Sequence, residues 1–456
     1  MNKIFKNIFL ILILILATCS RATAETLTYR NSLNQAINNS FDLKISNLDI
    51  DISKADLKAS RADLYPMLNF QANTEHNKDL SNSGNFAYAG NTVISPYTQY
   101  RDMAYLSATY NLFDFGVVGK KVFIAKKTID QKQISLDLQL KDLKLKVLEA
   151  YTKTLQCNDE IKTKSEVLKV YEEMFEAKER LFQAGTTDRI SVMDEAVKIA
   201  KTQDDIETSK LELKNALNDL STYTLQKYNP YDLEVLDLDE MNIKTEILPI
   251  SNIEPLKAKV ADEEIDFSFN PENSPESKYY NLELEKKKAE LTMYKRQRYP
   301  NFKFYASYAL FGQNPTQYFS AINNVSPTNI TVGLSGTFAI FDGFKNRATC
   351  EKAALELKKI QLQKEQKLNE IKMEYERTYA AYDSYTQELA LKKMLLNRVQ
   401  EKLTSVDRMN KSGLIEKNEM LSTKADLLTQ EFDLQKNIIN ISSKIKEIQI
   451  RTGRDI

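Results

Sequence analysis

The residue types that most often carry out catalysis are scarce in this sequence. It contains one histidine, His76, three cysteines and no tryptophan among 456 residues. One histidine cannot form a multi-histidine metal site, and the sequence signals no partners for a triad around it. The eleven glycines form neither of the phosphate-binding motifs G-x-G-x-x-G and G-x-x-x-x-G-K-[ST]. We therefore expect no enzymatic activity, no cofactor and no metal.

Two aspartates, Asp114 and Asp342, each stand where an alternating pattern gives way to a helical one. A carboxylate at such a point can accept hydrogen bonds from the free amides of the first helical turn. We predict that both are helix N-caps rather than catalytic groups. Cys157 and Cys350 lie in stretches with a helical pattern, and we expect ordinary buried thiols there.

The first 24 residues have the features of a secretory signal peptide. Lys3 and Lys6 form a positive start, residues 8–16 are apolar, and Ala22-Thr23-Ala24 is a small-x-small cleavage site. The mature chain is then expected to begin at Glu25. An alternative is a lipoprotein signal, in which Leu16-Ala17-Thr18-Cys19 would make Cys19 the acylated first residue.

The chain contains a duplication. A shift of 228 residues superposes the segment 106–114 on 334–342 and carries Gly185 onto Gly413. The interval from aspartate to glycine is the same in both copies. Two copies of one large unit indicate pseudo-twofold architecture rather than a solenoid of short repeats.

Each copy is predicted to contain a helix, a strand pair, a long helix and a return helix. The first repeat, 25–223, has a helix at 31–63, strands within 65–113, a long helix at 117–184 and a return helix at 191–223. The second, 276–456, has a helix at 276–298, strands within 299–341, a long helix at 345–410 and a return helix at 418–451. An acidic linker, 224–275, joins them.

The predicted strands alternate between apolar and polar residues. Leu68, Phe70 and Ala72 alternate with polar side chains, as do Ile330, Val332, Leu334, Phe338 and Ile340 in the second copy. A half-buried soluble sheet would show the same alternation. Aromatic residues at the strand ends and polar loops between strands favour a membrane β-barrel, apolar outside and polar inside. Because four strands cannot close around a pore, several chains must contribute.

The long helices carry heptad repeats typical of coiled coils. In the first copy, one row consists of Leu140, Val147, Thr154, Ile161, Leu168, Phe175 and Phe182, and a second row beside it of Leu136, Leu143, Ala150, Cys157 and Tyr171. In the second copy, the row consists of Leu368, Tyr375, Tyr382, Leu389, Leu396 and Leu403. A helix over 117–184 would be roughly 100 Å long. With a secretion signal and a barrel, it would extend far into the periplasm.

These motifs resemble the TolC-like outer-membrane efflux proteins, also called outer membrane factors. The matching pieces are residues 59–66 (A-S-R-A-D-L-Y-P), Asn270-Pro271-Glu272, Arg298-Tyr299-Pro300, the Leu-Phe-Asp of 112–114, the Ile-Phe-Asp-Gly of 340–343 and the two glycine turns. The resemblance implies an α+β membrane protein, in which a homotrimer forms a twelve-stranded β-barrel continuous with a periplasmic α-helical barrel. It also implies a passive exit duct for drugs or secreted proteins, in tripartite efflux or type I secretion, with a periplasmic adaptor and an inner-membrane ABC or RND-type pump as partners.

The resemblance also implies roles for residues near the glycine turns. The turns themselves, Gly185-Thr186 and Gly413-Leu414, would dock the adaptor. The family's acidic aperture positions fall on Glu419 and Ser422, and on Ser191 and Asp194 in the first copy, while its basic gate position falls on Ile415. One acid is kept, one is replaced and the basic residue is absent. Our hypothesis is that Glu419 and Asp194 edge the periplasmic aperture and favour cations, the alternative being solvated acids at helix starts.

Two other functions fit parts of the pattern. A periplasmic adaptor also has a coiled-coil hairpin, but it would carry compact β domains around a single hairpin. A trimeric coiled-coil adhesin would show one stalk with one terminal anchor. The duplication argues against both, and the charge balance of 63 basic and 63 acidic residues gives no field for binding nucleic acid.

Overall fold

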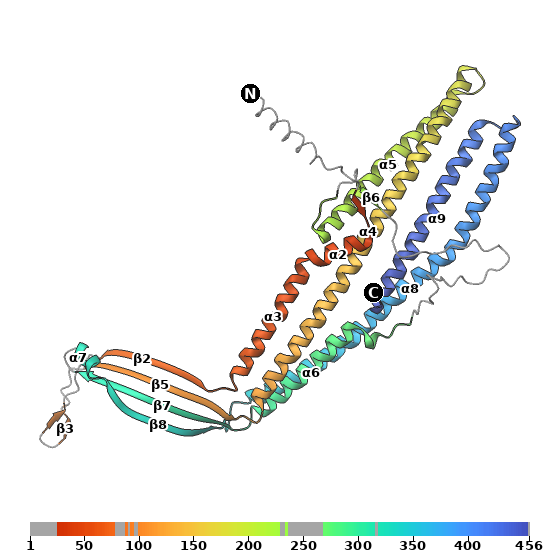
Figure 1. Ribbon diagram of the computed structural model, residues 1–456. Coiled ribbons are helices and arrows are strands. Elements are labelled where there is room, and N and C mark those ends of the chain that lie inside the picture. The colour runs from red at the N-terminus through yellow and green to blue at the C-terminus, as the bar shows by residue number, and fades with distance from the viewer. Residues whose placement is uncertain are drawn as a thin grey trace, which may run out of the picture. The chain divides into compact units, whose positions relative to one another are not determined.

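The computed structural model describes residues 25–77, 87–89, 92–94, 99–228, 233–235, 268–314 and 318–454 (Figure 1). It divides into two compact units. Unit 1 consists of Met1–Ile45, Leu136–Pro275 and Lys367–Ile456, and unit 2 of Ser46–Ser135 and Glu276–Gln366. The predicted signal peptide, Cys19 and most of the predicted acidic linker lie outside the described residues. Among the described residues, no helix is long and apolar enough to cross a membrane.

Unit 2 contains a four-stranded antiparallel sheet in the order β2-β5-β7-β8. The strands are β2 (Met67–Asn77), β5 (Gln99–Phe113), β7 (Asn301–Asn314) and β8 (Ser326–Thr337), with the short helix α7 (Tyr318–Asn323) between the last two. β3 (Ala87–Ala89) and β4 (Thr92–Ile94) form a small hairpin between β2 and β5. Among the strands that the structure describes, β2 and β8 each pair with one neighbour, so both edges of the sheet are open in this chain.

The strand register places the alternating residues on two consistent faces. Leu68 pairs with Ala108, Ala108 with Ala306, and Ala306 with Val332. The neighbouring row joins Asn69, Ser107, Ser307 and Thr331. Adjacent residues of a strand point to opposite faces, so one face is apolar and the other polar. The predicted alternation is therefore present across all four strands.

The helices of unit 2 are joined by polar side chains. α3 (Phe41–Ala62) is linked to α4 (Val117–Gln183) by an ion pair of Lys132 Nζ with Asp49 Oδ2 at 2.7 Å. Asp63, the residue after α3, pairs through its Oδ2 with Lys121 Nζ of α4 at 3.0 Å. α6 (Pro275–Arg296) is linked to α4 through Gln131 Nε2, which donates to Glu283 Oε2 at 2.8 Å. These contacts lie beside the sheet-proximal half of α4 and fix its two neighbours.

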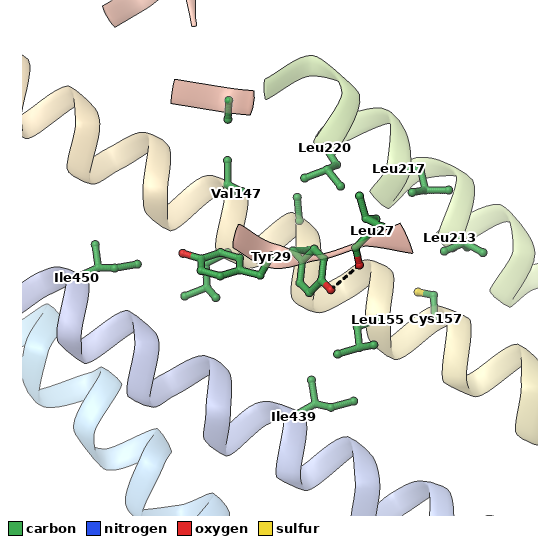
Figure 2. Close-up of a cluster of buried hydrophobic side chains, with 14 residues drawn as sticks. Leu27, Tyr29, Val147, Leu155, Cys157, Leu213, Leu217, Leu220, Ile439 and Ile450 are labelled. Atoms are coloured by element: carbon green, nitrogen blue, oxygen red, sulfur yellow. Dashed lines mark hydrogen bonds between the residues drawn. The ribbon is translucent and has the colours of Figure 1, made fainter. Parts of the chain in front are cut away.

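Unit 1 contains the main hydrophobic core, shown in Figure 2. Val147, Leu155 and Cys157 of α4 pack against Leu213, Leu217 and Leu220 of α5 (Arg189–Thr224) and against Ile439 and Ile450 of α9 (Lys417–Thr452). Tyr151 is fully buried and its hydroxyl donates to the carbonyl oxygen of Leu27 at 3.0 Å. This bond ties β1 (Glu25–Leu27), which pairs in parallel with β6 (Leu233–Val235), to the long helix. Cys157 is a packing residue, as predicted.

The second hairpin of unit 1 has its own core. Tyr382 and Leu389 of α8 (Lys345–Lys411), both in the predicted heptad row, pack against Ile441, Ile445 and Ile448 of α9. A third cluster joins Val167, Val170 and Met174 of α4 to Leu421 and Ala425 of α9. The helices of unit 1 thus lie in the order α5, α4, α9, α8.

Two predicted boundaries were wrong. The helix expected over 31–63 is two helices, α2 (Tyr29–Asn39) and α3, separated by Ser40, whose φ and ψ of −50° and 121° are not helical. Its hydroxyl accepts from the Leu43 amide at 3.3 Å, so a local side-chain bond replaces the helical ladder there. In the second copy β8 ends at Thr337, so Phe338 and Ile340 follow the strand rather than continue it. A single 3-10 turn, η1 (Pro271–Asn273), precedes α6.

Candidate functional site

The turn between α4 and α5 is built by its glycine. Gly185 has φ of +73°, a left-handed conformation that only glycine adopts without strain. Its amide donates to Phe182 O at 2.9 Å, and the Thr186 amide donates to Leu181 O at 2.9 Å. This pair of bonds closes the helix in a Schellman-type ending.

The turn between α8 and α9 repeats the same geometry. Gly413 has φ of +75°, and the Leu414 amide donates to Met409 O at 3.0 Å. Asn410 adds a side-chain bond, because its Nδ2 donates to Ile415 O at 3.1 Å. Leu414 is 73% exposed. Both predicted turns therefore end a helical hairpin of unit 1 (Figure 1), with an apolar side chain presented by the second.

The first helix turn after Gly185 is capped by Asp188, a residue that the sequence analysis missed. Its Oδ1 accepts from the Ser191 amide at 2.7 Å and its Oδ2 from the Ser191 hydroxyl at 3.1 Å. The Ser191 amide is the largest of the influences that lower the pKa of the Asp188 carboxyl. The pattern Asp-x-x-Ser was a readable capping signal. The equivalent residue of the second copy, Glu416, makes no side-chain cap bond.

The four predicted aperture residues have different surroundings. Asp194 and Glu419 are exposed, and no ion pair engages either carboxylate within the described ranges. Ser422 is half-buried, while Ser191 is held by Asp188. In one chain the two acids lie on different helices, α5 and α9, so the distance between their carboxylates depends on how the hairpins are assembled.

Two polar residues beside these acids are buried. Glu195, next to Asp194, is only 5% exposed and forms an ion pair with Lys198 Nζ at 3.2 Å. Asn418, next to Glu419, is buried, and within the described part of the chain its amide group has no hydrogen-bond partner. Sequence reasoning missed both, since a row of adjacent polar residues does not reveal which one faces inward.

The aspartates that precede the long helices do accept first-turn amides. Asp114 Oδ2 accepts from Val118 N at 2.6 Å, and Asp342 Oδ2 accepts from Asn346 N at 2.9 Å. Each acceptor lies three residues before the first residue of its helix rather than at the N-cap position itself. Between aspartate and helix, the chain turns through two residues with positive φ in each copy: Phe115 and Gly116, and Gly343 and Phe344.

Together these features define a class of protein. Two copies of a strand pair and a helical hairpin, an open-edged sheet with one apolar face, and glycine-turned hairpin ends are the features expected of an outer-membrane channel subunit. Residues 32–224 match the family model described as outer membrane efflux protein. This match covers less than half of the chain and agrees with the resemblance expected from its motifs.

Solved structures share the fold over nearly the whole chain. The CmeC outer membrane channel of Campylobacter jejuni is 12% identical with a TM-score of 0.74, covering 94% of this chain and 86% of that one. A membrane protein from Pseudomonas aeruginosa is 16% identical with a TM-score of 0.73, covering 93% of each chain. The open state of the MtrE outer membrane channel of Neisseria gonorrhoeae is 15% identical with a TM-score of 0.67, covering 93% of this chain and 88% of that one. Comparison with curated proteins gives no match.

Proposed function

We propose that three copies of this chain form an outer-membrane exit duct, which passively conducts drugs or secreted proteins from an inner-membrane pump. The observation that carries this proposal is the four-stranded sheet, with two open edges and one apolar face whose side chains are exposed in the single chain. Val332 is 63% exposed, and Phe70 and Leu334 are exposed as well. A sheet with these properties is incomplete alone, since unpaired edges and an apolar face need partners. Pairing β2 of one copy with β8 of the next closes twelve strands around a polar lumen.

The helices support the same closure. The order α5, α4, α9, α8 leaves α5 and α8 at the flanks of unit 1. On α5, Ile190, Met193 and Val197 form an exposed apolar row at helical spacing. On α8, Leu391, Met394 and Leu395 are exposed. We infer that the α5 flank of one copy packs against the α8 flank of the next, which is a heterologous contact that generates a ring.

The hairpin ends are the proposed docking points. Gly185, Thr186, Gly413 and Leu414 would contact a periplasmic adaptor, which in turn would hold an ABC or RND-type pump. Asp194 and Glu419 would edge the aperture, with Ser191 and Ser422 beside them. Their charges are exposed and unpaired among the described residues, which supports a preference for cations at the entrance.

The decisive test uses adjacent residues on opposite sheet faces. Val332→Lys places a charge on the apolar face, and Thr331→Lys places the same charge on the polar face one residue away. A lysine facing lipid costs about 2–4 kcal/mol per chain near the bilayer centre. We expect Val332→Lys to abolish outer-membrane insertion, and Thr331→Lys to leave a membrane-inserted trimer whose single-channel conductance is altered. Equal behaviour of the two variants, or a wild-type chain that is a water-soluble monomer without conductance in planar bilayers, would refute the duct.

The aperture hypothesis needs a separate measurement. Glu419→Gln should shift the reversal potential of single channels toward weaker cation selectivity. Glu431→Gln, a change of the same kind further along α9, is the control and should leave the selectivity as it is. Unchanged selectivity in Glu419→Gln would remove Glu419 from the aperture without affecting the duct.

A further inference from the structure

The helices of unit 2 form a row with α3 at one end and α8 at the other. α3 is ion-paired to α4, and α4 is hydrogen-bonded to α6. α6 is joined to α8 through Lys287, whose Nζ is paired with Glu356 Oε2 at 3.0 Å. The order of the helices is therefore α3, α4, α6, α8, and α3 and α8 each have a neighbour on one side only among the described helices of this unit.

Both end helices expose large apolar side chains. On α3, Leu48 and Ile52 are 62% and 58% exposed. On α8, Leu355 and Leu362 are 63% and 58% exposed. Residues four or seven positions apart lie on one side of a helix, so each pair forms an apolar stripe. The inner helices differ, since α6 exposes no large apolar side chain in its described range and α4 exposes only Phe123 within unit 2.

The two stripes lie at the same level. α3 leads into β2 and α8 follows β8, and the strand register puts the beginning of β2 and the end of β8 at one end of the sheet. The two helices therefore run antiparallel. Ile52 lies ten residues before the end of α3 at Ala62, and Leu355 lies ten residues after the start of α8 at Lys345, roughly 15 Å along each helix.

Charged residues flank both stripes at matching levels. Asp56 lies six residues before the end of α3 and Lys352 seven residues after the start of α8, so they are level to within about 2 Å. On the other flank, Asp51 and Lys358 are level to within roughly 3 Å. Each acid of α3 thus has a lysine of α8 at its own height.

The helical rotation places these charges on corresponding flanks. At about 100° per residue, Asp56 is rotated about 40° from Ile52, and Lys352 is rotated about 60° from Leu355 in the same sense. Asp51 and Lys358 are rotated from their stripes in the opposite sense. Two antiparallel helices that face each other bring flanks of the same sense together, so both acids would meet lysines.

These four charged side chains are exposed and available to a partner. Asp51 and Lys352 have a neighbour of opposite charge on their own helices, at 2.8 and 3.9 Å. Asp56 and Lys358 belong to no ion pair in the described part of the chain. Charges beside both stripes argue against a cover of lipid, because charged side chains are costly in hydrocarbon. They favour a protein surface of complementary pattern, which this chain itself carries.

We propose that α3 of one copy docks on α8 of the next, with Ile52 against Leu355 and two ion pairs that fix the register. The ion pairs are Asp56 with Lys352 and Asp51 with Lys358. This contact, named here the α3–α8 seam, rests on the proposed duct, in which β2 of one copy pairs with β8 of the next. It lets the chain select a second copy of itself, because a partner with another charge order leaves these charges unpaired or opposed.

Cross-linking in isolated outer membranes tests the geometry of the seam. Ile52→Cys combined with Leu355→Cys should give covalent dimers and trimers with a short bismaleimide on a denaturing gel. Every chain in this test carries Cys350→Ser, since Cys350 is only half-buried, whereas Cys157 is buried. Ile52→Cys combined with Leu362→Cys is the register control. Leu362 lies seven residues, roughly 10 Å, further along α8, so this chain should cross-link about tenfold more slowly or less.

Charge reversal tests the ion pairs. Asp56→Lys and Lys352→Asp each replace an attraction by a repulsion at every seam of the ring. Each should raise about tenfold or more the concentration at which half the chains are trimers, measured by analytical ultracentrifugation in detergent. The combined variant restores the pair in reversed order and should come within about threefold of the wild type, which also shows that these substitutions permit folding. Asp130→Lys, the same change at an exposed position of α4, is the matched control and should assemble as the wild type does.

Three results would overturn the seam. They are no cross-link between Ile52→Cys and Leu355→Cys, an equal rate in the register control, and a combined charge variant that assembles no better than the single ones. Conducting trimers without the cross-link would remove the seam and leave the duct standing. A chain that neither assembles nor conducts would refute the duct itself, and the seam with it.

Discussion

Glu447 joins the two helices of the second hairpin, and replacing it with glutamine should destabilise the protein. Its Oε2 accepts from Lys444 Nζ at 2.7 Å, and its Oε1 accepts from Arg451 Nε at 2.9 Å and from the Thr378 hydroxyl of α8 at 3.0 Å. Arg451 also pairs with Glu374 of α8 at 2.8 Å. Glu447 thus binds three side chains directly, two on α9 and one on α8, and Arg451 extends the network to Glu374.

The expected cost follows from the burial of this group. The Glu447 and Arg451 side chains are 16% and 20% exposed, so water screens their interaction only partly. Glu447→Gln keeps one acceptor and the shape but removes the charge from two charge-assisted bonds, each worth about 1.5–3 kcal/mol. Allowing for the acceptor that remains, we expect a loss of about 2–3 kcal/mol per chain at pH 7. The matched control is Glu376→Gln, which removes an exposed pair with Lys372 at 3.8 Å and should cost about 0–1 kcal/mol.

The pH dependence of the stability difference tests whether the charge of Glu447 is its cause. Burial opposes ionisation of Glu447, yet the bonds from Lys444 and Arg451 hold the pKa of the carboxyl below its ordinary value of 4.5. A group whose pKa is lowered by folding stabilises the fold above its unfolded value and loses that contribution as the pH falls through the folded value. Urea unfolding followed by circular dichroism should therefore show the difference between wild type and Glu447→Gln shrinking below pH 4.5. A difference that stays constant down to pH 3, or a control variant that costs as much, would refute this account.

Other substitutions test the turns and the core. Asp188→Ala should lower stability by about 1 kcal/mol in thermal unfolding, through loss of the cap on the Ser191 amide; the same loss in Asp194→Asn would contradict that reason. Tyr151→Phe should cost about 1–2 kcal/mol in urea unfolding, since it leaves the Leu27 carbonyl oxygen without its donor; an unchanged midpoint would show that water replaces the hydroxyl. Glycine-to-alanine changes should have opposite signs at two positions: Gly413, at φ of +75°, should lose about 1 kcal/mol, whereas Gly119, inside α4 with open space around it, should gain about 0.5–1 kcal/mol.

The strand faces could be predicted because they depend on local pattern. A period of two fixes which face a strand residue takes, and the register of four strands preserves it, as the row from Leu68 to Val332 shows. The predicted heptad rows identified only part of the buried surface of α4. Tyr151 is fully buried although it belongs to neither predicted row of α4, while Phe182, which does, is 43% exposed. A helix with several partners buries more than one stripe, and sequence periodicity does not reveal how many partners it has.

The candidate site was predictable only where backbone chemistry decides the structure. Gly185 and Gly413 were found because a left-handed helix ending favours glycine. Asp188 and Glu195 were missed, although they lie within ten residues of Gly185. Capping and burial depend on which of several adjacent polar residues faces the neighbouring helix. That choice is made by packing between hairpins, such as the contact of Val170 with Leu421, which are far apart in the sequence.

The two strand-to-helix turns show what the duplication preserves. The first copy reads Asp114-Phe115-Gly116 and the second Asp342-Gly343-Phe344, so phenylalanine and glycine have exchanged places. Both turns nevertheless place two successive residues at positive φ, with values of 56° and 80° in the first and 64° and 65° in the second. A phenylalanine in this region costs about 1–2 kcal/mol, and it is retained in both copies.

The retained aromatic rings have contacts that offset this cost. Phe115 lies 4.7 Å from Phe113 and 4.8 Å from Tyr299 between ring centroids, and Phe344 lies 5.4 Å from Phe341. Aromatic pairs at these distances contribute about 0.5–1.5 kcal/mol each beyond the area they bury. The two copies therefore share a backbone turn and an aromatic contact rather than a residue order. A left-handed turn held by an aspartate precedes each long helix, and its geometry is the same in both halves although the order of phenylalanine and glycine is not.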